Sequence, residues 1–186
     1  VYAASDWVAR AVRVGEQVVL FAEHTEVVRR LKLLLEKQRI SYVVVAGDTP
    51  KKNRQEAIDS FQSGEIAVFI GTKAAMTGIT LTNAKHLCFV ERFWTSAEEE
   101  QAEDRIRRIS QKHPTKIWYL HATGTVDERI DYVVRKKRKM IASHIGGETI
   151  EESPEKNVLE MIADWSKQVS ADVHNGDPML GLVKSL

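Results

Sequence analysis

Three polar side chains with regular spacing could do chemistry together: the carboxamide of Gln101 and the guanidinium groups of Arg105 and Arg108. On a helix, these positions (i, i+4 and i+7) lie on one face. A guanidinium is always charged and carries forked donors, so a pair of them suits a phosphoryl group whose charge spreads in the transition state. The spacing therefore predicts a helical face that binds an anion. The alternative is a solvated basic face that pairs with nearby carboxylates, namely Glu98, Glu99, Glu100 and Asp104.

The stretch 101–111 resembles the Q-A-x-D-R-x-x-R-I-G-Q motif of Swi/Snf-type ATPases, and more broadly the arginine-finger motif of superfamily-two helicases. The resemblance implies that Arg105 and Arg108 are catalytic arginine fingers that reach an ATP held on another lobe, with Gln101 facing the nucleotide. Arg107 stands where the family usually has His, which removes neither finger. Each finger is expected to contribute roughly a thousandfold or more to turnover.

A second segment, residues 71–80, follows an apolar run and resembles the family's S-T-K-A-G-G-x-G-L-N segment. Backbone N–H and hydroxyl groups at the carboxyl end of a strand suit phosphate oxygens. The resemblance implies that Thr72 and Lys73 grip a nucleic-acid backbone and that Gly78 lets the chain approach the nucleotide closely. The same letters also fit an ordinary turn. The Ala-Ala-x-x-Gly form of this segment, followed later by Phe-Trp, resembles the annealing-helicase (HARP-like) branch.

Two further residues lie in segments that resemble family motifs. Arg54 ends a stretch similar to D-G-S-T-P-x-x-x-R, and a first-turn arginine beside a helix N-terminus is well placed for a nucleic-acid phosphate. Helix capping by Thr49, with Pro50 in the first turn, explains the same stretch. Trp94 lies in a turn that resembles D-P-x-W-N-P, where it either presses against a sugar-phosphate backbone or packs against a neighbouring helix.

Five short apolar runs must position these groups, and they alternate with segments of helical spacing. Such alternation predicts a parallel sheet flanked by helices. The runs VVLF, YVVV, IAVFI, HLCFV and IWYL are apolar almost throughout, which indicates that both faces of the sheet are covered. The expected strands are Gln17–Phe21, Tyr42–Val45, Ile66–Ile70, His86–Val90 and Lys116–Leu120.

Helices are expected between the strands. The segment Thr25–Lys37 carries apolar residues at helical spacing. Two further starts have capping-box spacing, in which a hydroxyl residue is followed three positions later by a glutamate. These starts are Ser96 with Glu99 and Thr125 with Glu128.

The resemblance covers about residues 5–145 and implies an α/β fold, a RecA-like three-layer sandwich with a mostly parallel central sheet. We therefore expect residues 1–147 to form a helicase C-terminal RecA-like lobe. A chain of 186 residues can bury one core of this size. Residues 148–186 are expected to add a linker, a helix and a tail as a C-terminal helical extension.

Composition narrows the possible partners. The net charge is +1, so nucleic-acid binding must come from local basic clusters, found near Arg105 and at Arg135–Lys139. No apolar run approaches the roughly 18 residues of a membrane span, so no membrane partner is expected. The single cysteine, Cys88, lies in an apolar run and is expected to be buried. The six histidines have no telling ligand spacing, so no metal site is expected.

Two parts of a complete motor are missing from the sequence: the G-x-x-x-x-G-K-[ST] loop that cradles phosphates and an acidic strand end for Mg²⁺. ATP with Mg²⁺ is therefore expected to be held mainly by a first RecA-like lobe, and this chain alone should not hydrolyse ATP. Since the chain begins with Val1, we expect a longer gene product. The resemblance implies the second motor lobe of an ATP-dependent translocase that acts on double-stranded DNA inside the cell. The alternatives are a lobe of a strand-separating DNA or RNA helicase and a non-catalytic nucleic-acid docking module.

Overall fold

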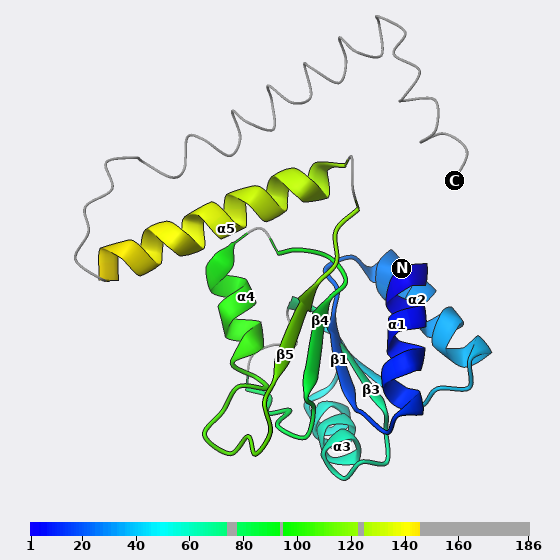
Figure 1. The fold of residues 1–186 in the computed structure, drawn as a ribbon. Coiled ribbons are helices and arrows are strands. Elements are labelled where there is room, and N and C mark those ends of the chain that lie inside the picture. Colours follow the sequence, from blue (N-terminus) through cyan, green and yellow to red (C-terminus); the bar gives the residue numbers. More distant parts are fainter. Residues whose placement is uncertain (74–77, 94, 123–124, 146–186) are drawn as a thin grey trace, which may run out of the picture. The chain divides into compact units, whose positions relative to one another are not determined.

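The computed structural model describes residues 1–73, 78–93, 95–122 and 125–145, and a five-stranded sheet lies at its centre (Figure 1). The strand order is β2-β3-β1-β4-β5, and all four strand pairs are parallel. The predicted strands are confirmed: Tyr42–Val45 is found with the expected bounds, and the ends of the other four differ by at most two residues. They are β1 (Val18–Phe21), β2 (Tyr42–Val45), β3 (Val68–Gly71), β4 (His86–Phe89) and β5 (Lys116–Tyr119).

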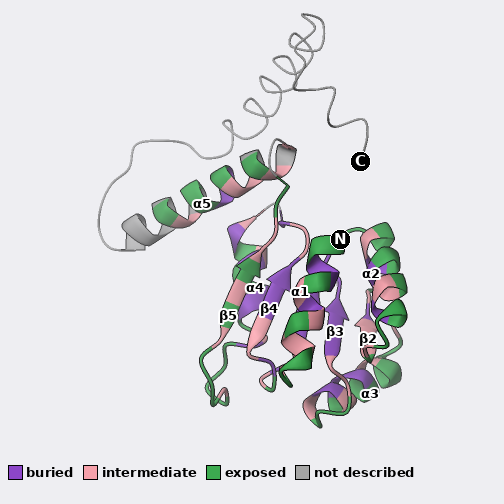
Figure 2. Ribbon diagram, turned by 45° about the vertical axis from the view of Figure 1, so that its right-hand side comes forward, coloured by how far each residue is buried: buried purple, intermediate pink, exposed green. Residues whose placement is uncertain are grey.

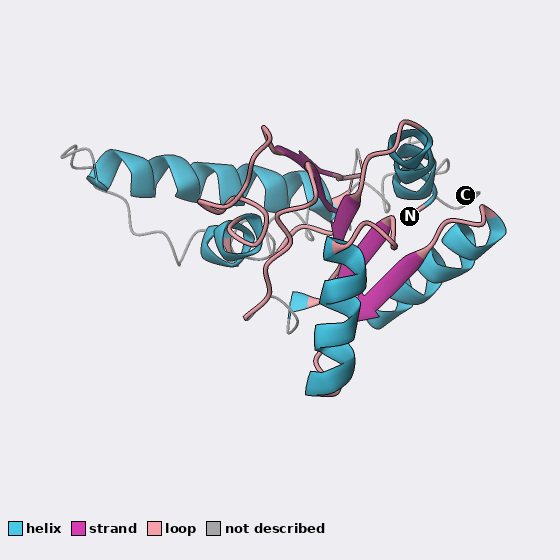
Figure 3. Cartoon of the chain, turned by 90° about the horizontal axis from the view of Figure 1, so that it is seen from below, coloured by secondary structure: helices cyan, strands magenta, loops and turns pink. Residues whose placement is uncertain are grey.

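Helices cover both faces of this sheet, as Figure 3 shows in a view from below. Helices α1 and α2 pack with Val18 and Leu20 of β1 in one core, and α3 and α4 pack with Val19 and Phe21 in the other. Because alternate side chains of each strand enter opposite cores, the central strands are buried (Figure 2). The predicted RecA-like three-layer sandwich is therefore confirmed, and its sheet is wholly parallel. The helices are α1 (Tyr2–Arg13), α2 (Thr25–Lys37), α3 (Lys51–Gln62) and α4 (Ser96–Glu103).

Two predicted helix starts are wrong by one residue. Helix α3 is preceded by Pro50 at the N-cap, and the Thr49 hydroxyl instead accepts a hydrogen bond of 2.8 Å from the Ala46 N–H, which closes the turn after β2. Helix α4 is capped by Thr95, whose hydroxyl accepts from the Glu98 N–H at 3.3 Å. Ser96 is consequently already helical and buried. At α4 two neighbouring hydroxyl residues of similar capping ability, Thr95 and Ser96, competed, and spacing alone did not decide between them. At α3 the Thr49 hydroxyl is used by the turn, so the helix begins one residue later without a side-chain cap.

Helix α1 was not expected from the strand pattern, yet it buries Ala4 and Val8 against the sheet. These residues are four apart and lie one turn above each other on the helix. The apolar residues Ala4, Val8 and Ala11 recur at helical spacing, so the sequence does carry a local signal for this helix.

The chain divides into two compact units, Val1–Thr123 and Gly124–Leu186. Helix α5 (Val126–Ile145) belongs to the second unit, and the Thr125 hydroxyl accepts from the Asp127 N–H at 3.2 Å beside its start. The predicted helix start in this region is confirmed. The predicted domain boundary at residue 147 and the extension 148–186 stay predictions, because residues 146–186 lie outside the described part.

The prediction that Cys88 is buried is confirmed. Its thiol lies in the middle of the sheet with no exposed surface, and burial raises its pKa to about 12. A thiolate is the reactive form of cysteine, so this side chain is protonated and unreactive near neutral pH. Cys88 therefore has a packing role in the core shared with α1 and α2.

Candidate nucleotide and nucleic-acid interface

The two candidate arginine fingers lie in a turn after α4 and not on the helix. We call residues 104–110 the arginine turn. Helix α4 ends at Glu103, and the N–H of Arg105 already bonds to the carbonyl three residues back, on Ala102, at 3.1 Å. The prediction that Gln101, Arg105 and Arg108 share one helical face is therefore wrong. The chain tightens here because Ile106 is drawn fully into the core.

The arginine turn is joined to the loop that follows Gly78. The Leu81 N–H donates to the Arg105 carbonyl at 2.9 Å, and Arg108 Nη2 donates to the Ile79 carbonyl at 3.5 Å. Gly78 itself has a φ of +75°, a left-handed conformation that favours glycine. The structure thus brings together Gly78, Arg105 and Arg108, which are separated by up to thirty residues in sequence.

Electrostatics at the arginine turn favours an anion. Partial burial lowers the pKa of Arg105, and the neighbouring positive charge of Arg108 lowers that pKa further, while Asp104 opposes the shift. Among the described residues, neither arginine forms an ion pair, and both Nε atoms donate to carbonyls, of Gln101 at 3.0 Å and of Asp104 at 3.4 Å. Two adjacent positive charges without a carboxylate partner attract negative charge. They border an open hollow lined by Asp104, Arg105, Arg107, Arg108, Ile109 and Ser110.

Thr72 and Lys73 follow β3 at the carboxyl edge of the sheet. Thr72 is buried, and its N–H donates to the Val45 carbonyl at 3.1 Å. The ammonium group of Lys73 forms an ion pair with Glu98 in the first turn of α4, and this hydrogen bond raises the pKa of Lys73. Residues 74–77 lie outside the described part. Lys73 is therefore held at the start of α4, while the arginine turn lies at its end, about 12 Å along an eight-residue helix.

Arg54 lies in the first turn of α3, as the sequence predicts. Its Nη2 donates to the Ala46 carbonyl at 3.4 Å, a long hydrogen bond, and its Nε is buried without a hydrogen-bond partner. The guanidinium thus has donor capacity that the turn after β2 leaves unused. Trp94 lies outside the described residues, so its predicted contact with a nucleic-acid backbone stays a prediction.

Sequence reasoning missed a buried charge cluster behind the arginine turn, made of Arg92, Glu99, Glu103 and Tyr119. Arg92 and Glu99 form two parallel bonds of 2.7 and 2.9 Å, with side chains that are 2% and 0% exposed. The Arg92 guanidinium lies 4.3 Å from the centre of the Tyr119 ring, and the Tyr119 hydroxyl donates to Glu103. The sequence does contain one indication of a buried carboxylate. Ser96, Glu99 and Ala102 are three residues apart, so small residues flank an acidic one on a single helical face.

A second carboxylate orders the loop after β1. Glu91 accepts hydrogen bonds from the N–H groups of Glu23 at 2.9 Å and His24 at 3.0 Å, and it bonds His24 Nδ1 at 2.6 Å. His24 is the residue that precedes α2. Glu91 thereby ties the segment after β4 to the start of α2, across neighbouring parallel strands.

The contribution of the His24–Glu91 pair to the stability of the fold is expected to depend on pH. The hydrogen bond that His24 donates to the Glu91 carboxylate raises the pKa of His24 above 6.5. The pair therefore stabilises the fold fully below about pH 6.5 and loses this contribution as the pH rises through the folded-state pKa of His24. We expect Glu91→Gln to lower the pKa of His24 in an NMR titration. His86, whose pKa is lowered by burial, is the internal control. An unchanged His24 titration in Glu91→Gln would contradict the assignment.

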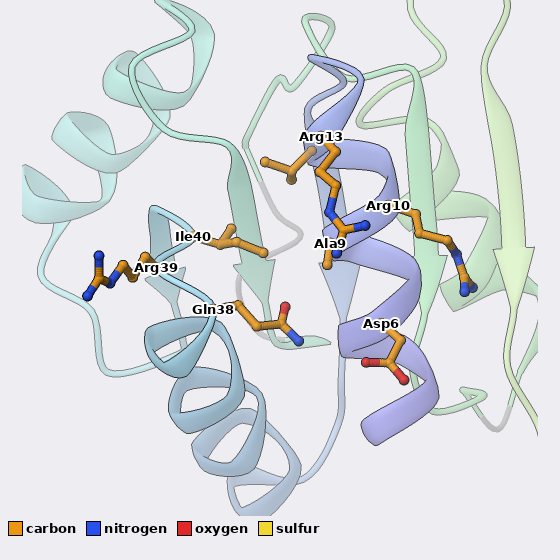
Figure 4. A pocket seen from close by; sticks show the side chains of 8 residues that line it. Asp6, Ala9, Arg10, Arg13, Gln38, Arg39 and Ile40 are labelled. Carbon is orange, nitrogen blue, oxygen red and sulfur yellow. The ribbon is translucent and has the colours of Figure 1, made fainter.

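Another hollow lies between α1 and the end of α2 (Figure 4). Although three arginines line it, Figure 4 shows that Arg10 and Arg39 point away from one another and from the hollow. Gln38 is already engaged, since its amide donates to Ser5 Oγ at 3.0 Å. Without convergent donors this hollow is a poorer anion site than the arginine turn.

Neither a membrane-spanning helix nor a cluster of metal-ligating side chains occurs among the described residues. No helix there is long and apolar enough to cross a membrane. No cluster of three or more His, Cys, Asp or Glu side chains in the same part of the chain could hold a metal ion.

Comparison with known proteins agrees with this fold. Residues 4–110 match the family model described as the helicase conserved C-terminal domain. The human DNA repair and recombination protein RAD54B is 32% identical over 126 residues, which cover 66% of this chain and 14% of that protein. A Xenopus laevis protein named SWI/SNF-related matrix-associated actin-dependent regulator of chromatin subfamily A-like protein 1 is 35% identical over 129 residues, covering 68% of this chain and 13% of that protein.

A solved structure of an ATPase domain is also similar to this chain. The C-terminal part of the Fun30 ATPase domain superposes with a TM-score of 0.67 and 25% sequence identity, covering 71% of this chain and 43% of that one. The matched part of this chain spans only about one seventh of the length of the human and Xenopus laevis relatives.

Proposed function

Because this chain belongs to the helicase conserved C-terminal domain family, within its Swi/Snf-type group, we propose that it is the second motor lobe of an ATP-dependent double-stranded DNA translocase or remodeller. A first RecA-like lobe would hold most of the ATP and its Mg²⁺. This lobe would supply Arg105 and Arg108 to the nucleotide, with Gln101 and Gly78 beside it. The names of the relatives, which include DNA repair and chromatin proteins, favour action on DNA inside the cell.

The observation that carries the proposal is the arginine turn and its attachment to the loop after Gly78. Hydrogen bonds at Leu81 and Ile79 hold the turn, and Arg105 and Arg108 border an open hollow without a carboxylate partner among the described residues. Charge that develops on a transferred phosphoryl group is stabilised by donors that are already in place before the reaction. A turn held in this way suits an arginine that must enter a site on another lobe.

The DNA side of the proposed lobe would use Thr72, Lys73, Arg54 and Trp94. Phosphate contacts of this kind position a protein on DNA without reading its sequence. Lys73 would exchange its carboxylate partner Glu98 for a phosphate when DNA binds. Since Lys73 and the arginine turn sit at opposite ends of α4, one short helix would connect the DNA and nucleotide contacts.

The experiment that tests the proposed function compares two activities of the full-length protein on DNA, triplex displacement and duplex separation. We expect DNA-stimulated ATP hydrolysis and ATP-dependent displacement of a third strand from a triplex, with no separation of a plain duplex. Duplex separation would instead favour a strand-separating helicase, and DNA binding without ATP hydrolysis would favour a docking module. We also expect the isolated chain to show no ATP turnover; turnover that survives Arg105→Ala would contradict the proposal.

A further inference from the structure

Glu103, at the last position of α4, is a buried carboxylate with partners on two sides. Its side chain is 5% exposed and accepts a hydrogen bond of 2.8 Å from Arg107 Nη1. It also accepts from the hydroxyl of Tyr119 on β5. A buried charge is costly unless it is paired and hydrogen-bonded, so these contacts hold the carboxylate and its partners in place.

The partner Tyr119 is fixed to the sheet. Its ring stacks on Phe89 of β4 with a centroid distance of 5.1 Å and an interplanar angle of 3°. The Arg92 guanidinium covers it at 4.3 Å, and Arg92 is locked by Glu99. Glu103 therefore links the arginine turn to β5 of the parallel sheet.

The same residue also holds the main chain of the arginine turn. The Glu103 carbonyl accepts from the N–H groups of Ile106 at 3.1 Å and Arg107 at 2.9 Å. Arg107 is thus bound to Glu103 through both its backbone and its guanidinium. It lies between Arg105 and Arg108, so a shift of Arg107 must move the residues on either side.

Arg107 differs from its two arginine neighbours in its pairing. Its guanidinium is engaged by a carboxylate, whereas Arg105 and Arg108 donate to carbonyl groups. A guanidinium that is paired in this way has fewer donors to offer a phosphate. This pairing gives the three arginines of one short turn different tasks.

We infer that Glu103 and Arg107 form a clamp that positions the arginine fingers, with Arg107 as a structural support and not as a third finger. The inference rests on the proposed function, since it concerns the same ATP site. Glu103 and Arg107 are positioning residues that act through Arg105 and Arg108. Misplacement of a reacting group by about 1 Å can cost roughly a hundredfold in rate.

The test uses the full-length protein with Arg107→Gln, Glu103→Gln and the double variant. We expect each single change to lower kcat for ATP hydrolysis by roughly 10- to 100-fold, with KM for ATP and Kd for DNA unchanged. The double variant should lose no more than the worse single variant, because the two residues act as one unit. Arg107→Lys, which keeps the charge next to Glu103, should restore most of kcat.

The matched control is Arg30→Gln. Arg30 forms an ion pair of the same type and spacing with Glu26, at 2.8 Å on α2. This variant should keep full activity, and melting temperatures of all variants should stay above the assay temperature. If Arg107 instead touches ATP or DNA, Arg107→Gln will raise KM for ATP or Kd for DNA. Glu103→Gln, which frees the Arg107 guanidinium, will then lower the same constant. This pair of results overturns the inference.

Two failures can be told apart. Normal turnover in both Arg105→Ala and Arg108→Ala contradicts the proposed function itself. Loss of turnover in those variants, together with normal kcat in Arg107→Gln and Glu103→Gln, overturns only the clamp.

Discussion

Replacing Arg108 with alanine in the full-length protein is expected to lower kcat for DNA-stimulated ATP hydrolysis by about a thousandfold or more. The proposed reason is that the guanidinium stabilises charge on the transferred phosphoryl group in the transition state. Arg105→Ala is expected to have a similar effect. Because this loss falls on the transition state, affinity for DNA should stay nearly unchanged, and steady-state kinetics with a separate DNA-binding assay will check both quantities.

Two further variants sharpen this prediction. Arg108→Lys keeps the charge but loses the forked donors, so it should restore little activity. Arg10→Ala removes an exposed arginine of α1 and should leave turnover unchanged. Full recovery in Arg108→Lys would show that general positive charge suffices, and normal turnover in both Arg105→Ala and Arg108→Ala would refute the finger assignment.

The second large effect concerns stability. Arg92→Met is expected to lower the free energy of unfolding by about 3–5 kcal/mol, because it leaves Glu99 buried with its bidentate partner removed. Urea denaturation of this chain, followed by circular dichroism, measures the change. The variant also removes the guanidinium from the face of Tyr119.

The double variant Arg92→Met with Glu99→Leu separates the cost of a broken pair from the value of the pair. Replacing both charges with apolar groups of similar size is often close to neutral, so the double variant should recover most of the lost stability. Arg29→Met breaks an exposed pair with Glu26 and should change stability little. Equal destabilisation in the single and double variants would contradict this account.

The strands could be predicted because a parallel sheet covered on both faces needs continuous apolar runs, and β1 and β4 show this plainly. Helix α2 could be predicted as Thr25–Lys37 because its apolar residues keep the helical period. Both signals are local, since a few neighbouring residues carry them. These local signals were sufficient to predict which strand or helix each described motif residue lies in or next to in the sequence.

The shape of the arginine turn could not be predicted from spacing. Helical spacing continues from Gln101 to Arg108, but packing of Ile106 into the core and the hydrogen bond from Leu81 end the helix at Glu103. Tertiary contacts here override the local pattern. The Arg92–Glu99 pair was equally hidden, because its geometry depends on the path of the chain between β4 and α4.

The burial of Cys88 has a practical consequence for labelling. It is the single cysteine of this chain, and its thiol is fully enclosed with a pKa of about 12. A maleimide dye should therefore ignore it, so the native cysteine can stay in place. Ile109, whose side chain is fully exposed next to Arg108, offers a position for one introduced cysteine. A fluorophore there would report on the approach of the proposed first lobe in real time, from a chain whose interior is untouched.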